Sequence, residues 1–342
     1  MLEFFGIEFY QLLSFFRQLG LSLAGAASFW GMIFLYIAKK KEGTEIGKII
    51  MFWVSMRLRW LVFGGGMLAI ISWIWLLFIT PAVAHEGVTL VTEFDGILSA
   101  AYTMTPVYSL LAIVFFVALL LRNSNKLYNF KKGLSWFYMA VFLLSSIAIS
   151  YYTDLSNLTL KEMIFHPFHG FHSIFTLGTV LTLDFLFLST KNAPLVQKHV
   201  FPYFPQISKV IWIGLSLDLL STLLIYPEAI SLSPRFFFAQ TVVGILIING
   251  ILLSGVLTRR ILKHIDNGEF ESSKKWELFA TIAGAISVTS WVSITFVDFF
   301  HDLSLSLPIL FGIYTAVIIF GIISHTIWNK LDTTAERMVH IK

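Results

Sequence analysis

Nine apolar runs, each long enough to cross a bilayer as a helix, constrain this chain more than any other feature. About 18 or more apolar residues are needed to cross roughly 30 Å of hydrocarbon, at about 1.5 Å of rise per residue. Transmembrane barrels need short alternating segments instead, so the pattern predicts an all-α fold, a polytopic transmembrane helical bundle. The predicted spans cover residues 10–38, 49–79, 102–122, 134–152, 169–189, 208–226, 236–258, 277–297 and 308–328.

The composition agrees with a chain that lies in the membrane along its whole length. Its 342 residues are 57% hydrophobic and 13% charged, which excludes an ordinary soluble globule and a disordered chain. No linker or soluble domain separates the spans, so we expect a single integral membrane domain over residues 1–342, built as one leading helix plus four helical hairpins. Residues 1–5 carry an acid and no base, so no cleavable leader is expected.

The basic residues are sorted by side. Of the 24 Lys and Arg residues, 21 lie in the loops after the odd-numbered spans, around Arg57 and Arg59, or in the C-terminal tail. The other three are Arg17, Lys161 and Arg235. The positive-inside rule therefore predicts a multi-pass protein of a bacterial-type cytoplasmic membrane, with the N-terminus outside and the C-terminus cytoplasmic. This sorting accounts for the basic charge, so no nucleic-acid partner is expected.

A histidine cluster stands at the outer start of the fifth predicted span. His166, His169 and His172 follow one another at spacings of three, with Pro167 in the position of a first helical turn. Ring nitrogens bind haem iron, copper and zinc, and the neighbouring phenylalanines are typical of a haem pocket or of an interfacial aromatic belt. The same predicted side holds His85 and His301. The sequence leaves open whether the cluster binds a cofactor or is merely interfacial.

Cysteine is absent from the chain, so histidine and carboxylate are its strong metal ligands. A second set of ionisable residues lies deeper in the predicted spans: Asp184 in the inner half of the fifth, Asp218 near the middle of the sixth and His325 near the inner end of the ninth. Such residues commonly pair in the bundle interior and mark proton or ion paths. Polar contacts between helices are the alternative interpretation.

The fifth span carries a resemblance to a known family. His169-Gly-Phe-His-Ser-Ile-Phe-Thr-Leu-Gly178, followed by Asp184 and by residues 208–214, resembles the histidine helix of the copper-resistance D-like superfamily, which includes a haem-binding membrane protoporphyrinogen oxidase family. It is also similar to uncharacterised multi-span bacterial membrane proteins. The resemblance covers mainly residues 169–260. It implies that His169 is the ligand of haem or copper, and it leaves open whether the chain is a membrane haem oxidoreductase.

Three functions follow from these patterns. The first is a membrane protein that binds haem b, or copper, at its outer face and takes part in electron transfer or redox chemistry. His169 is then the axial ligand, with His172, His301 or His85 as the second, and a redox partner is implied. The second is copper or other metal-ion transport or homeostasis, in which His166, His169 and His172 collect the ion and Asp218, Asp184 and His325 pass it, or protons, inward. The third is a structural subunit of a membrane complex. We expect redox or metal chemistry to be confined to the outer half.

Overall fold

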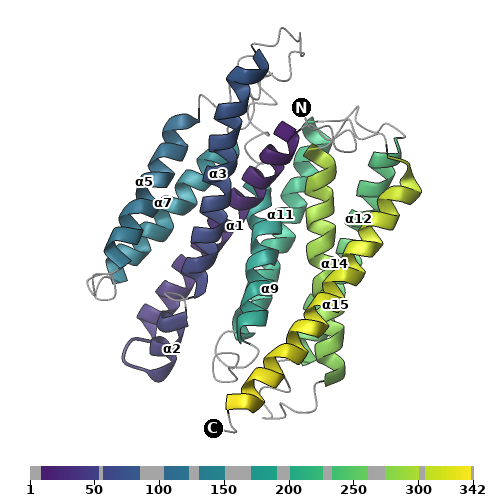
Figure 1. The fold of residues 1–342 in the computed structure, drawn as a ribbon. Helices are drawn as coiled ribbons and strands as arrows, with labels where there is room; N and C mark the ends of the chain where they lie inside the picture. The colour runs from purple at the N-terminus through teal and green to yellow at the C-terminus, as the bar shows by residue number, and fades with distance from the viewer. Residues whose placement is uncertain are drawn as a thin grey trace. The chain divides into compact units, whose positions relative to one another are not determined.

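The computed structural model describes residues 9–53, 57–84, 104–122, 131–150, 171–190, 201–225, 233–260, 263, 274–299 and 305–339. Within these ranges the chain is helical, apart from short turns and helix ends, and contains no strand. The all-α prediction is therefore confirmed for the described residues (Figure 1).

The chain divides into two compact units, residues 1–230 and 231–342. Unit 1 contains α1 (Phe9–Lys40), α2 (Glu45–Trp53), α3 (Arg59–Ala84), α5 (Thr105–Arg122), α7 (Lys131–Ser150), the π-helix η3 (Ile174–Gly178), α9 (Thr179–Thr190), the 3₁₀-helix η4 (Phe201–Tyr203) and α11 (Phe204–Ile225). Unit 2 contains α12 (Pro234–Ile251), the π-helix η5 (Leu252–Leu257), α14 (Lys274–Phe299) and α15 (Leu307–Val339). The single membrane domain over residues 1–342 stays a prediction.

Six of the described helices are long and apolar enough to cross a membrane. They are the apolar parts of α1, α3, α7, α12 with η5, α14 and α15; residues 105–119 and 171–186 form shorter apolar helices. Each of the nine predicted ranges coincides with described helix, and the second range takes in both α2 and α3. The structure thus fits a membrane protein with several transmembrane helices, whereas nine spans and the predicted sidedness stay predictions.

Helix α1 is the centre of unit 1. It packs against α2, α3, α7, η3 and α9 (Figure 1). Helices that are near it in the sequence and helices that are far from it therefore both contact α1. Its closest neighbour is α3, because Gly20 and Gly65 face each other. A Cβ atom built on Gly65 would lie 2.7 Å from the carbonyl oxygen of Gly20 and 2.8 Å from the backbone nitrogen of Ala24. Small residues commonly allow such close approach between membrane helices, and Ala24 and Gly65 do so here.

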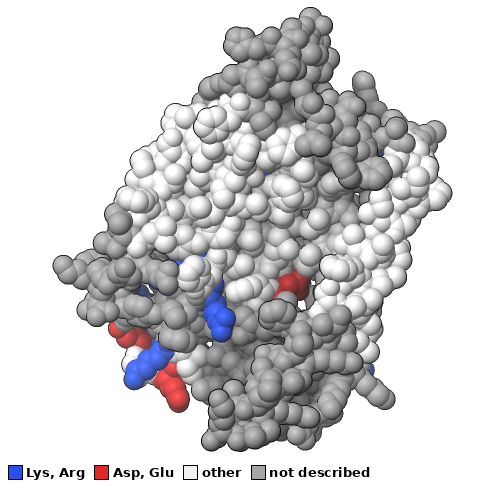
Figure 2. Space-filling model, viewed as in Figure 1, with Lys and Arg blue, Asp and Glu red and all other residues white. Residues whose placement is uncertain are grey.

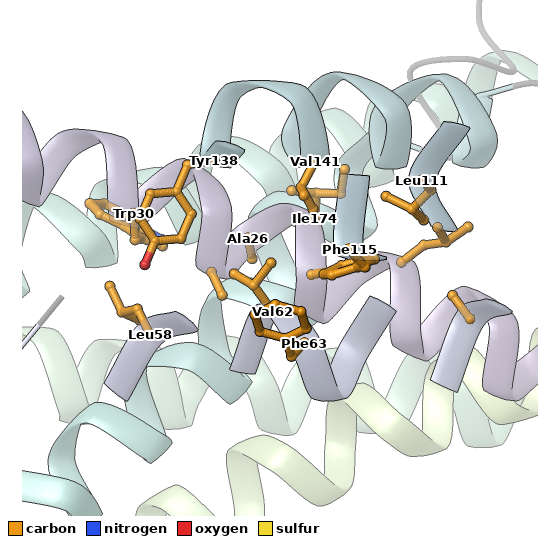
Figure 3. Packing of buried hydrophobic residues seen from close by; sticks show 14 of the residues in the cluster. Ala26, Trp30, Leu58, Val62, Phe63, Leu111, Phe115, Tyr138, Val141 and Ile174 are labelled. Carbon is orange, nitrogen blue, oxygen red and sulfur yellow. The ribbon is translucent and has the colours of Figure 1, made fainter. Parts of the chain in front are cut away.

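Large side chains fill the space beside this contact. The rings of Phe63 on α3 and Phe115 on α5 lie 5.1 Å apart, and Tyr138 of α7 is completely buried beside α1. Figure 3 shows these side chains together with Trp30 of α1 and Ile174 of η3 in one continuous apolar cluster. Helices from most of unit 1 therefore share a single core.

Unit 2 is built on α14, which packs against α12 and α15. Ser233 caps the start of α12 by accepting a hydrogen bond from the Phe236 N–H at 3.2 Å, and Pro234 occupies the first turn, where its missing N–H is not needed. Buried polar side chains join the helices. The Asn249 side chain of α12 donates to the Ala283 carbonyl of α14 at 2.8 Å, and the hydroxyls of Ser290 and Tyr314 lie 2.7 Å apart.

The outside of the described helices is rich in exposed apolar side chains, as expected for a surface that contacts lipid. Figure 2 shows that most of the described surface in view carries neither basic nor acidic side chains. Most of the charged atoms visible there lie toward the end of unit 1 that holds α2 (Figures 1 and 2). Lys39, Lys40, Lys41 and Lys48 are all exposed at this end.

Candidate functional site

The structure brings His172 and Asp218 together on neighbouring helices of unit 1. The Nε2 atom of His172 lies 3.3 Å from Oδ1 of Asp218, and the two side chains are only 15% and 12% exposed. The contact joins the start of the helical segment 171–190, which corresponds to the fifth predicted span, to α11. An imidazole and a carboxylate thus form a largely buried pair within the apolar helices.

Gly214 accounts for this pairing. A Cβ atom at Gly214 would lie 2.8 Å from Cγ2 of Thr176 and 3.0 Å from Cβ of Phe175, so the missing side chain lets α11 approach η3 closely. Thr176 comes four residues after His172, and Gly214 comes four residues before Asp218. Because the two helices run in opposite directions, one turn from the Gly214–Thr176 contact brings His172 opposite Asp218.

Ser173, next to His172, anchors the same segment to α1. Its hydroxyl oxygen accepts hydrogen bonds from the Gln18 side chain at 3.0 Å and from the Ser22 hydroxyl at 2.9 Å. Further along, the Trp30 indole N–H donates to the Thr179 hydroxyl at 3.3 Å. Residue numbers rise together on the two helices in these contacts, so α1 runs parallel to η3 and α9. His172 is therefore level with the early part of α1.

The segment between His172 and α9 is a π-helix rather than an α-helix. The Thr179 hydroxyl donates to the carbonyl of Ile174 five residues earlier, at 3.1 Å, whereas the Thr176 and Thr182 hydroxyls donate to carbonyls four residues earlier, at 2.9 and 2.8 Å. Gly178 is the last residue of the π-helix and lies directly against α1, where a Cβ atom would collide with the Ser22 carbonyl oxygen. Single π turns inside α-helices are frequent at functional sites.

Asp184 lies on α9, twelve residues beyond His172, which corresponds to about 18 Å along the helix axis. Its Oδ2 atom is buried and has no hydrogen-bond partner among the described residues. Because Thr179 pairs with Trp30, Asp184 lies toward the end of α1 that carries Lys39–Lys41. The carboxylates of Asp218 and Asp184 therefore occupy different levels, and His172 lies beside Asp218.

Buried hydroxyls line the helix between these levels. Ser173, Thr176, Thr179 and Thr182 recur every three residues and are each at least 96% buried. Arg17, on α1 near Gln18, is also buried inside unit 1, although the sequence placed it among the few basic residues of the outer side. The interface of α1 with η3 and α9 is thus more polar than the sequence pattern indicated.

Several predicted site residues cannot be located. His85, His166, His169 and His301 lie outside the described residues, and His325 lies in α15 but its side chain is not described. Within the described ranges, no three residues among His, Asp and Glu are grouped so that they could hold a metal ion. The proposed cofactor ligands therefore stay predictions, apart from the observed position of His172.

Sequence reasoning put His172 in an outer cluster and Asp218 in a separate buried set, and missed their contact. The available signal was the order of the spans. Consecutive spans run in opposite directions, so the beginning of the fifth lies beside the later part of the sixth when the two helices are neighbours. The chain matches no family model, no curated protein and no solved structure.

Proposed function

We propose that this chain is an integral membrane protein that takes up a proton at the His172–Asp218 pair and passes it through unit 1 toward Asp184. The observation that carries the proposal is the 3.3 Å contact between His172 Nε2 and Asp218 Oδ1, made by side chains that are largely removed from solvent. Ionisable groups inside a membrane bundle are costly, and they commonly mark proton or ion pathways.

The chemistry of the pair suits a proton. The two ring nitrogens of histidine can each donate or accept a proton, and a carboxylate accepts hydrogen bonds. An imidazole in contact with a carboxylate can therefore accept a proton from one side and release it to the other. A metal ion needs further ligands, and His166 and His169, which lie close by in the sequence, are the candidates for these.

Asp184 supplies a second acceptor on the same helix. Its buried Oδ2 is not hydrogen-bonded to any described residue, and the buried hydroxyls of Ser173, Thr176, Thr179 and Thr182 lie between it and His172 along the sequence. Hydroxyl groups both donate and accept hydrogen bonds, so they can relay a proton if their side chains turn. We propose this row as the route between the two levels.

The test is proton flux into liposomes that contain the purified full-length chain. An outward potassium gradient with valinomycin sets an inside-negative potential, and a trapped pH-sensitive dye reports proton entry. We expect wild-type protein to admit protons and His172→Gln and Asp218→Asn to lower the rate about tenfold or more. Glu45→Gln, which removes an exposed carboxylate from the start of α2, should leave the rate unchanged. Wild-type liposomes as tight as empty ones would overturn the proposal.

A second function, haem b or copper binding with redox chemistry, is favoured by one separate observation. A histidine that binds a metal through one ring nitrogen commonly donates a hydrogen bond from the other ring nitrogen to a carboxylate. The contact between His172 and Asp218 has this form. Four phenylalanine rings adjoin η3: the Phe171 and Phe175 rings lie 4.9 Å apart, and Phe29 and Phe142 pack against them. These rings would give a haem an apolar wall.

In this second proposal His169 is the axial ligand, and His172, His301 and His85 are the candidates for the second. His169 and His172 are only three residues apart in the sequence and cannot bracket one iron, so the ligand on the opposite face should come from another hairpin. A bound haem would supply one-electron chemistry, while Asp218 would orient His172. The absorbance spectrum and the iron and copper content of the purified protein test it. A Soret band that is lost in His169→Ala would support haem, copper without porphyrin would support a copper site, and protein free of both would refute this proposal without affecting the first.

A further inference from the structure

One face of α3 is exposed along its whole length and changes character from basic to apolar. Arg57 is exposed just before α3 and is followed on the same face by Trp60, Gly64, Met67 and Ile71, at spacings of three and four. The face continues to Phe78, which is 73% exposed. From Trp60 to Phe78 it measures about 27 Å, close to the thickness of the hydrocarbon core.

Aromatic side chains mark both ends of this face. Trp60 is 49% exposed at one end, and Trp75 and Phe78 are exposed at the other. Tryptophan is enriched at the two membrane interfaces, so Trp60 indicates where the headgroup region begins. Arg57 then lies at headgroup level. The guanidinium carbon of Arg59 lies 6.0 Å from the centre of the Trp60 ring, which holds a second cation beside the same position.

This end of unit 1 carries a strong excess of positive charge. Its described basic residues are Lys39, Lys40, Lys41, Lys48, Arg57 and Arg59, against the two acids Glu42 and Glu45. The lysines stand on an ordered turn. Thr44 caps α2 by accepting from the Gly47 N–H at 3.2 Å, and its hydroxyl donates to the Lys41 carbonyl at 2.7 Å. The positive charge is therefore presented in a fixed place.

Gly64 leaves a shallow gap in the apolar part of the face. It is exposed, and a Cβ atom built on it would meet no other atom within 4 Å. The side chains of Trp60 on one turn and Met67 on the next border this gap. An acyl chain that lies along α3 can enter it, while the lipid phosphate reaches Arg57 and Arg59.

From these observations we infer that the exposed face of α3 from Arg57 to Ile71 binds an anionic phospholipid, whose phosphate contacts Arg57 and Arg59 and whose acyl chain lies over Gly64. Basic residues at headgroup level each strengthen binding to an anionic membrane about fivefold. The interaction should weaken as salt concentration rises, because Arg57 is exposed and Arg59 is only partly buried.

Native mass spectrometry of the full-length protein with equal amounts of phosphatidylglycerol and phosphatidylcholine tests this site. We expect wild-type protein to retain phosphatidylglycerol preferentially and Arg57→Gln to lower that preference about fivefold. Arg57→Lys, which keeps the charge, should preserve most of it. Arg235→Gln is the matched control, because it removes an arginine from the start of α12 in unit 2 and should change little.

Two further measurements distinguish a lipid site on α3 from a general attraction of anions and from a loss of folding. Gly64→Leu should lower lipid retention without lowering the helical content or the unfolding temperature, since Gly64 is exposed and a Cβ atom built there meets nothing within 4 Å. Excess glycerol phosphate should not displace the lipid. Equal retention of the two lipids by wild-type protein, an equal loss in Arg235→Gln, or displacement by glycerol phosphate would each overturn the inference.

Discussion

Replacing Gly65 by alanine should separate α1 from α3, whereas the same change at its neighbour Gly64 should not. The added Cβ at Gly65 would lie 2.7 Å from the Gly20 carbonyl oxygen and 2.8 Å from the Ala24 nitrogen. Both are backbone atoms, so no side-chain rotation relieves the contact. The helices must move apart by roughly half an ångström or more to restore ordinary contact distances near 3.5 Å.

The magnitude follows from two opposing terms. Overpacking of a close contact costs about 1–3 kcal/mol, and alanine favours a helix interior over glycine by about 1 kcal/mol. Gly65→Ala should therefore be destabilised by up to about 2 kcal/mol. Gly64→Ala gains the helix preference and meets nothing within 4 Å, so it should be stabilised by up to about 1 kcal/mol.

The assay is unfolding of the purified variants by titration with sodium dodecyl sulfate in mixed micelles, followed by circular dichroism. The helix preference for alanine is the same in both variants, so the expected difference between them is the overpacking cost, about 1–3 kcal/mol. Because both changes are glycine to alanine in one helix, effects on the unfolded state largely cancel. Equal stabilities of Gly64→Ala and Gly65→Ala would refute the reasoning, and so would a stabilised Gly65→Ala.

Two other contacts give predictions of the same kind. Gly178→Ala would force η3 away from the Ser22 carbonyl. We expect a loss of about 1–2 kcal/mol in the free energy of unfolding, measured by the same titration, together with slower proton entry. Unchanged stability would count against the described contact. Asn249→Ala removes the donor to the Ala283 carbonyl in unit 2; we expect a loss of about 1 kcal/mol, with proton entry unaffected, and a loss of proton entry would show that unit 2 takes part in the route.

The helices were predictable because hydropathy reports directly on residence in the membrane. Every predicted range overlaps helix in the described part of the chain, since apolar runs in a bilayer must satisfy their backbone groups internally. The central place of α1 was not predictable from hydropathy. An apolar residue has similarly apolar surroundings whether it faces lipid or packs against another helix. The apolar pattern therefore does not show which face of a helix is packed. The small residues around Ala24 were the useful signal, and the structure uses them against Gly65.

The candidate site was predictable only in part, for a related reason. The sequence identified His172, Asp184 and Asp218 as unusual, because ionisable groups in apolar runs are rare. It did not show which two would meet. Which two residues meet depends on how each helix is rotated about its own axis. Gly214 and the π turn of η3 set this rotation, and neither is visible in a hydropathy pattern.

The π turn decides which face of α9 carries Asp184, and this gives the proposed route its sharpest test. Each α-helical residue turns the chain by about 100°, so one extra residue in a turn rotates everything that follows relative to His172. In the observed register Oδ2 of Asp184 is buried, and Thr182 two residues earlier is buried as well. If Asp184 receives the proton, Asp184→Asn should lower proton entry into liposomes about tenfold while leaving the phosphatidylglycerol preference intact. Asp184→Glu should restore part of the rate. A purely structural role predicts the opposite order, because asparagine has the same size as aspartate and would be tolerated, whereas the longer glutamate would overpack the site.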